Sequence, residues 1–173
     1  MTAPNNIVIA ADLSGKTGWC AGSSLADVKF GLIRLPNAPD NPGSRWAAAR
    51  NHICDLIEEW RAKVPGVPVY LVIERDYPAH RQTHQTSAVQ QMSLTAIMEL
   101  AAHDEDVMLR KVSPSTVRTY VMGRGHGKMD KKAKEGGEIV RWLMRQGWSV
   151  FDHNVADAIL LWAWGKELKN VIR

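Results

Sequence analysis

Three acidic residues stand at places in the sequence where the secondary-structure elements of one domain would meet. Asp12 ends the apolar run IVIAAD and Glu74 ends the apolar run VYLVIE, so each closes a predicted buried strand. Asp157 stands near the start of NVADAILLWAW, which is typical of a buried helix. Carboxylates forced together repel one another unless a cation lies between them, and Mg²⁺ prefers oxygen ligands. The three acids therefore predict a magnesium-type site, which in a basic protein indicates phosphodiester chemistry.

Each acid also has a purely structural interpretation. Asp12 could cap the turn that follows it, and Glu74 could pair with a nearby arginine. Asn154 and Asp157 have the spacing of a helix N-cap and the third residue of the helix, where an acid suits the helix dipole. Taken singly, each acid stays ambiguous, so the prediction of a metal site depends on the set of three.

The elements that would carry these acids follow from the pattern of apolar residues and turns. The predicted strands are 6–12, 17–22, 27–35, 69–74 and 106–112. The predicted helices are 44–63, 86–103, a short helix after Ser113, 131–146 and a last helix from about Asn154. Ser44 and Ser113 are the predicted N-caps of the first and third of these helices. Short turns between the first three strands favour an antiparallel meander. The strand 69–74 is apolar nearly throughout, which predicts a central position covered on both faces. Together these elements indicate a mixed α/β layer fold.

Positive charge is concentrated in one segment of the chain. The net charge is +4, yet between Arg110 and Lys134 eight Lys and Arg residues stand against one acid, Asp130. That segment carries +7, and the rest of the chain therefore carries −3. A concentrated basic segment is the pattern of a protein that binds a polyanion, although a solvated helix face can share it.

Length and composition predict a single domain, residues 1–173. No apolar stretch approaches the length of a membrane span, and MTAPNNIVIA lacks the features of a signal peptide, so we expect a cytoplasmic location. Cys20 and Cys54 form no CxxC pair, which predicts buried, reduced thiols rather than a zinc site or a disulfide.

The motifs around the three acids resemble those of the RuvC-like Holliday junction resolvases, within the RNase H-like (retroviral integrase) superfamily. The matching residues are Asp12 in AADLSGKTGW, Glu74 in LVIERDY, and Asp157 in the ADA step before an apolar helix. The resemblance implies an RNase H-like fold: a five-stranded mixed sheet, three antiparallel strands and then two parallel ones, flanked by helices. It also implies a Mg²⁺-dependent endonuclease, with Mn²⁺ as an alternative ion, that resolves four-way DNA junctions or other branched DNA by paired nicks.

The resemblance implies roles for individual residues as well. Asp12, Glu74 and Asp157 would bind two metal ions and carry the catalysis, and Tyr77 would engage the junction. The residues expected to neutralise DNA phosphates are Lys111, Arg118, Arg124, Lys128, Lys131 and Lys132.

Two further expectations concern the fourth active-site group and the assembly. Many family members have an acid or a histidine three residues before the last Asp, and here that position is Asn154. Asp152 and His153 stand beside it, so any of the three could complete the site. Because two matched nicks call for two symmetric centres, we expect a homodimer.

Three other functions fit parts of the pattern. A nuclease of the same fold could cut RNA–DNA hybrids or replication forks, and a non-catalytic DNA-binding module would share the basic segment. DLSGKTGW also resembles the phosphate-binding hairpin of actin-like kinases and ATPases. However, 173 residues are few for two such lobes, and no second adenosine motif is visible.

Overall fold

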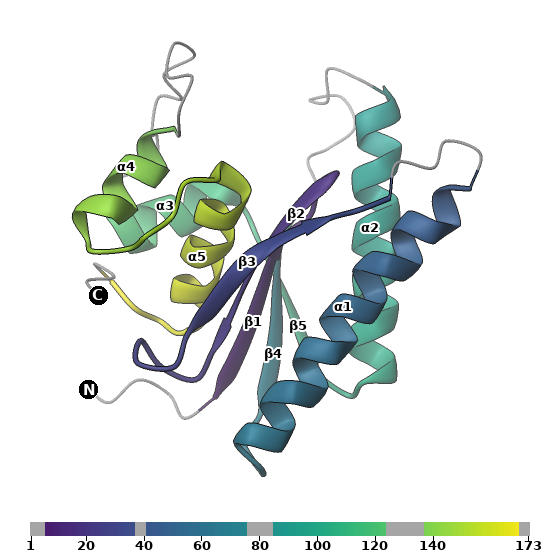
Figure 1. The fold of residues 1–173 in the computed structure, drawn as a ribbon, viewed down its shortest axis with the longest axis horizontal. Helices are drawn as coiled ribbons and strands as arrows, with labels where there is room; N and C mark the ends of the chain where they lie inside the picture. The colour runs from purple at the N-terminus through teal and green to yellow at the C-terminus, as the bar shows by residue number, and fades with distance from the viewer. Residues whose placement is uncertain (1–5, 37–40, 76–84, 124–136, 170–173) are drawn as a thin grey trace.

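A five-stranded mixed sheet forms the centre of the molecule, with helices on both faces (Figure 1). The computed structural model describes residues 6–36, 41–75, 85–123 and 137–169. The strands are β1 (Ile7–Asp12), β2 (Lys16–Gly22), β3 (Lys29–Arg34), β4 (Val69–Glu74) and β5 (Met108–Val112). The helices are α1 (Pro42–Lys63), α2 (Gln85–Asp104), α3 (Pro114–Met122), α4 (Glu138–Arg145) and α5 (His153–Gly165).

The strand order is β3-β2-β1-β4-β5. The short turns after β1 and β2 produce antiparallel pairs, whereas β4 and β5 run parallel to β1 because a helix precedes each of them. β1 and β4 are central and almost entirely buried, as their apolar sequences predict. The predicted arrangement of three antiparallel and two parallel strands is therefore confirmed.

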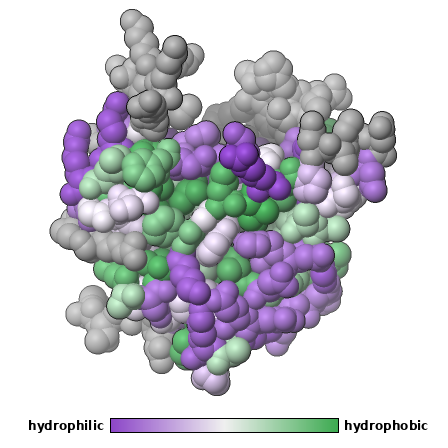
Figure 2. Space-filling view, in the orientation of Figure 1, coloured by the Kyte–Doolittle hydropathy of each residue, from purple (hydrophilic) through white to green (hydrophobic). Residues whose placement is uncertain are grey.

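Each face of the sheet carries its own apolar core. α1 and α2 cover one face, and α3, α4 and α5 lie on the other (Figure 1). Figure 2 shows hydrophilic side chains gathered over the outward side of α1, which is the pattern of a helix with one buried face. Cys20 and Cys54 are buried and unpaired, as expected.

α5 lies unusually close to the sheet, and glycines permit the contact at both of its ends. At Gly18 of β2, a Cβ atom would lie 2.1 Å from the backbone oxygen of Asn154. At Gly165 of α5, a Cβ atom would lie 2.8 Å from Cγ1 of Val8 and 2.9 Å from Cγ2 of Val72. Only glycine fits such distances, so these positions fix how α5 sits on β1, β2 and β4.

Several helix starts differ from the predicted ones. Asp152, and not Asn154, is the N-cap of α5, because its carboxylate accepts hydrogen bonds from the backbone N–H groups of Asn154 at 2.8 Å and Val155 at 3.3 Å. α1 begins at Pro42, two residues before Ser44. Proline suits the first turn of a helix, because the backbone N–H groups there have no hydrogen-bond partner within the helix and the lack of an N–H in proline costs nothing.

Two other helix starts involve cap residues. α4 begins at Glu138 with Gly137 as its N-cap, later than the predicted start near Lys131, and residues 131–136 lie outside the described residues. Glycine disfavours helix interiors, which explains a start after Gly137. The predicted cap of α3 is confirmed, since the Ser113 hydroxyl accepts a hydrogen bond from the backbone N–H of Thr116 at 3.2 Å.

Candidate active site

The alternation of side chains along β1 and β4 brings two of the predicted acids to the same face of the sheet. Val8 and Ala10 of β1, and Val72 of β4, belong to the core on the side of α5. Because every second residue of a strand points to the same face, Asp12 and Glu74 also lie on this side. β1 and β4 are adjacent and parallel, so both acids end their strands at one edge of the sheet.

The start of α5 brings Asp157 to this edge. Gly18 stands opposite Asp12 in the β1–β2 register and lies directly beneath the backbone of Asn154. Asp157 follows one turn later, on the part of α5 that faces α3, where its side chain meets Arg118. The ends of β1 and β4 and the start of α5 therefore place the three acids at one end of the sheet, and their role as metal ligands stays a prediction.

The pKa values of the acids reflect first their burial and then the charges around them. Burial raises the pKa of Asp12 to about 8, and the negative charges of Glu74, Asp157 and Asp152 add to this effect. Burial, followed by the charge of Asp157, raises the pKa of Glu74 to about 7. Burial also raises the pKa of Asp157, although Arg118 opposes that shift. The cluster thus holds protons that a cation would displace.

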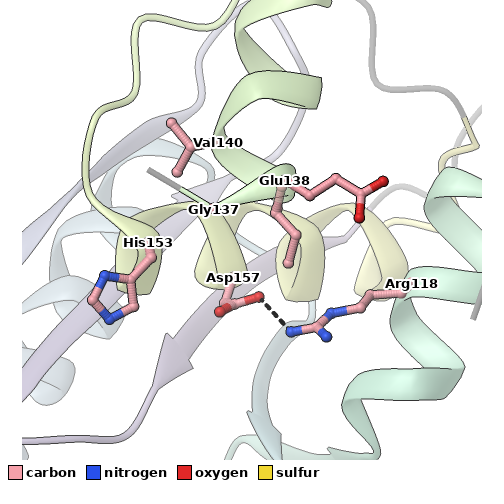
Figure 3. A pocket seen from close by; sticks show the side chains of 7 residues that line it. Arg118, Gly137, Glu138, Val140, His153 and Asp157 are labelled. Carbon is pink, nitrogen blue, oxygen red and sulfur yellow. Dashed lines mark hydrogen bonds and ion pairs between the residues drawn. The ribbon is translucent and has the colours of Figure 1, made fainter. Parts of the chain in front are cut away.

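Arg118 forms an ion pair with Asp157. Its Nη2 lies 3.4 Å from Oδ1 of Asp157, and the two side chains face each other from α3 and α5 (Figure 3). Arg118 also lines a small depression together with Glu74 and Asp157. A phosphate bound beside the acids could therefore accept hydrogen bonds from this guanidinium group.

The three candidates for the fourth active-site group lie in different surroundings. The carboxylate of Asp152 caps α5 and still acts on the charge of Asp12. His153 lines a small depression of about 40 Å³ with Asp157 and Glu138 (Figure 3). Asn154 is buried and lines a different depression, beside Asp12. Each of the three reaches the cluster, and their catalytic roles stay a prediction.

The donor set suits a hard divalent cation. Within the part of the chain that the structure describes, no three His, Cys, Asp or Glu side chains are arranged as a ready-made metal site. The acids nevertheless share one edge, repel one another and offer only oxygen ligands, which is the chemistry that favours Mg²⁺ or Mn²⁺. Asp12, Glu74 and Asp157 are the residues that would hold such an ion.

The predicted DNA-binding residues are divided between the two faces of the sheet. Arg118 lies in the site, whereas Lys111 of β5 forms an ion pair with Glu99 of α2, on the opposite face. The sequence signal of positive charge did not distinguish these two environments. Tyr77, Arg124, Lys128, Lys131 and Lys132 lie outside the described residues, so their roles stay predictions.

Some residues near the acids were not predicted from the sequence. Gln90 and Gln91 of α2 line the depression beside Asp12, and Glu138 of α4 lines the one beside Asp157. The adjacent glutamines at the start of a helix, shortly after a polar loop, are the signal that could have drawn attention to them.

Solved structures of Holliday junction resolvases are similar to this chain over most of its length. Thermus thermophilus RuvC is 16% identical with a TM-score of 0.62, and the match covers 90% of each chain. RuvC from the same organism in complex with Holliday junction substrate is 12% identical with a TM-score of 0.63, over 90% of this chain and 89% of that one. The yeast mitochondrial Holliday junction resolvase Ydc2 is 14% identical with a TM-score of 0.55, over 95% of this chain and 79% of that one.

These likenesses establish the class of fold. The chain has the RNase H-like α/β fold, in the form found in RuvC and Ydc2, which confirms the predicted fold and the resemblance at that level. No protein-family model and no curated protein matches the sequence. In the described residues, no helix has the length and apolar character needed to cross a membrane.

The raised pKa of Asp12 predicts how stability depends on pH without divalent metal. Because its pKa rises from 3.8 to about 8, the folded protein binds this proton more tightly than the unfolded chain does. The resulting stabilisation is complete below the unfolded pKa and is lost as the pH rises through the folded value. We expect the free energy of unfolding to fall between about pH 4 and about pH 8.

Asp12→Asn, which stays neutral, should raise the free energy of unfolding by about 2 kcal/mol near pH 9 and by less near pH 5. Urea unfolding in EDTA measures this difference. If the variant were no more stable than the wild-type protein near pH 9, the conclusion that the Asp12 carboxylate is buried would be contradicted.

Proposed function

We propose that this protein is a Mg²⁺-dependent, structure-selective endonuclease that cuts branched DNA, with four-way junctions as its main substrate. The observation that carries the proposal is the convergence of Asp12, Glu74 and Asp157 at one edge of a RuvC-like sheet. The likeness to a RuvC structure in complex with Holliday junction substrate supports branched DNA as the partner.

The buried acids and Arg118 would have different roles in the reaction. Asp12, Glu74 and Asp157 would hold divalent cations, which when bound supply Lewis-acid activation of water and stabilisation of the leaving 3′ oxygen. Arg118 would donate hydrogen bonds to the phosphate and exchange its contact with Asp157 for one with substrate. His153 lies beside Asp157 and could accept or deliver a proton at the rim of the site.

The DNA-binding residues expected from the sequence complete the proposal. Tyr77 would stack on an unpaired base at the crossover. Arg124, Lys128, Lys131 and Lys132 would neutralise phosphates without reading sequence. Lys111 is proposed with them on the condition that it leaves Glu99, because the two side chains form an ion pair.

We propose further that two copies assemble through α2. Val89 is 57% exposed, Met92 56% and Leu100 48%, and their spacing places them on one side of the helix. An exposed apolar stripe of this kind favours a partner surface, and a symmetric pair would supply the two centres that paired nicks need.

Met92→Glu tests the assembly, because a charge at the centre of this stripe would have to be buried in the dimer. We expect the wild-type protein to be a dimer and the variant a monomer in size-exclusion chromatography with light scattering. Met144→Glu is the matched control, since Met144 is an exposed methionine on α4. A dimer that survives Met92→Glu would place the interface elsewhere.

The proposed activity is tested with a synthetic four-way junction, a fork, an RNA–DNA hybrid and a linear duplex of equal length. With Mg²⁺ or Mn²⁺ we expect two symmetric nicks in the junction, faster than any cut in the other substrates, and no cutting in EDTA. Preferential cutting of the hybrid or the fork would assign a different nuclease activity. Binding without cutting in either metal would indicate a non-catalytic DNA-binding module.

A further inference from the structure

A depression beside Asp12 lies next to the three acids and has a different chemistry from theirs. It has a volume of about 330 Å³, which falls at the lower end of the range of small-ligand sites. It is lined by Asp12, Leu13, Ser14, Gly15, Gln90, Gln91, Leu94 and Asn154. These residues come from the end of β1 and the turn after it, from α2, and from the start of α5, which the fold brings together at one end of the sheet (Figure 1).

The polar groups of this depression are available to a ligand. Asn154 is only 7% exposed, and it lines the depression together with Asp12. Gln90 and Gln91 make no side-chain hydrogen bond within the part of the chain that the structure describes, and Nε2 of Gln90 would lie 3.6 Å from a Cβ atom at Gly15. The carboxamides of Gln90, Gln91 and Asn154 line the depression, so a ligand with a polar edge could replace water as their hydrogen-bond partner.

The charge of the depression argues against a phosphate as its ligand. Of the eight described lining residues, Asp12 alone is ionisable, and none is a cation. Three carboxamides and the hydroxyl of Ser14 instead offer neutral donors and acceptors, while Leu13 and Leu94 add apolar surface. A flat heterocycle with a hydrogen-bonding edge matches this combination, and in DNA that group is an unpaired nucleobase.

We propose that this depression receives one unpaired nucleobase of the strand whose phosphate lies at Asp12, and that Gln90, Gln91 and Asn154 read its edge. The proposal rests on the proposed function, because it assigns the base beside the cut phosphate. Asn and Gln side chains pair best with adenine, through two hydrogen bonds, so adenine is the expected occupant. Base preference at the cut would then arise here, since contacts to phosphates carry no sequence information.

The test uses four-way junctions with identical arms that differ only in the nucleotides flanking the crossover. For the wild-type protein we expect the rate of cutting to vary by about tenfold or more with one flanking base, and to be highest for adenine. Gln90→Leu and Gln91→Leu should each reduce this variation to about threefold or less. Gln146→Leu, a carboxamide of the α4 C-cap, is the matched control and should keep the wild-type preference.

The outcomes separate this proposal from the proposed function. Equal cutting of all junctions by the wild-type protein, or a preference unchanged in both glutamine variants, would overturn the base site and leave the nuclease intact. If the wild-type protein cuts no junction, the nuclease proposal fails, and binding of the same junctions in EDTA tests the depression alone. Base-dependent affinity that both variants lose would then support the site, and base-independent affinity would overturn it.

Discussion

Asp12→Asn is expected to lower the rate of junction cutting by about a hundredfold or more while the affinity for junction DNA is kept. The substitution retains the size of the side chain but removes the charge that would bind a cation, and the loss of one such transition-state interaction has about this effect. Asp12 is also the acid on which the charges of Glu74, Asp157 and Asp152 all act, so it stands at the centre of the cluster. Single-turnover cutting with saturating protein measures the rate apart from binding.

Asp55→Asn is the matched control for this prediction, because Asp55 is an exposed carboxylate of α1, on the opposite face of the sheet from Asp157. The control should cut at the wild-type rate. A rate for Asp12→Asn within about threefold of the wild-type rate would exclude Asp12 from the catalytic step.

Among the glycines that the structure describes, Gly18 is the one where an added methyl group should have the largest effect. The new Cβ atom would lie 2.1 Å from the backbone oxygen of Asn154 and 2.5 Å from the nitrogen of Val155. Backbone atoms cannot rotate away as a flexible side chain does, so α5 must move off β2 or the sheet must bend. We expect a loss of about 3 kcal/mol or more in the free energy of unfolding, with a loss of cutting because Asp157 moves with α5.

Gly43→Ala, in the first turn of α1, is the control for the added methyl group. There the nearest atom to the new Cβ is Oδ1 of Asn41 at 3.3 Å, on a side chain that can turn aside. Its stability should stay within about 1 kcal/mol of the wild-type value. A stable and fully active Gly18→Ala protein would show that the close packing of α5 against β2 does not position Asp157.

The strands and their acids could be predicted from the sequence because burial on both faces leaves a strong pattern. The apolar runs that end in Asp12 and Glu74 predict β1 and β4, and the alternation of side chains then places both acids on one face. Asp157 could be predicted only as a member of the set, since its position in α5 also suits a structural acid.

Other features depend on contacts between distant residues, which local patterns do not contain. Asp152 and Asn154 are both good N-cap residues, so the sequence alone does not show which of them begins α5. In the structure Asp152 is the N-cap, and the backbone of Asn154, inside the helix, packs against Gly18. Lys111 and Arg118 carry the same charge in one basic segment, yet β5 directs one toward Glu99 and α3 directs the other toward Asp157. The depression at Gln90 exists only because the first part of α2 lies beside the β1–β2 turn.

Binding of Mn²⁺ to the protein without DNA, followed by electron paramagnetic resonance and calorimetry, tests most directly whether the three acids form one ion site. The wild-type protein should bind Mn²⁺, more tightly as the pH rises past the raised pKa values of Glu74 and Asp12, near 7 and 8. Asp12→Asn, Glu74→Gln and Asp157→Asn should each weaken that binding by about tenfold or more. Wild-type affinity in all three variants, or no binding by the wild-type protein at any pH where it is folded, would contradict a shared metal site.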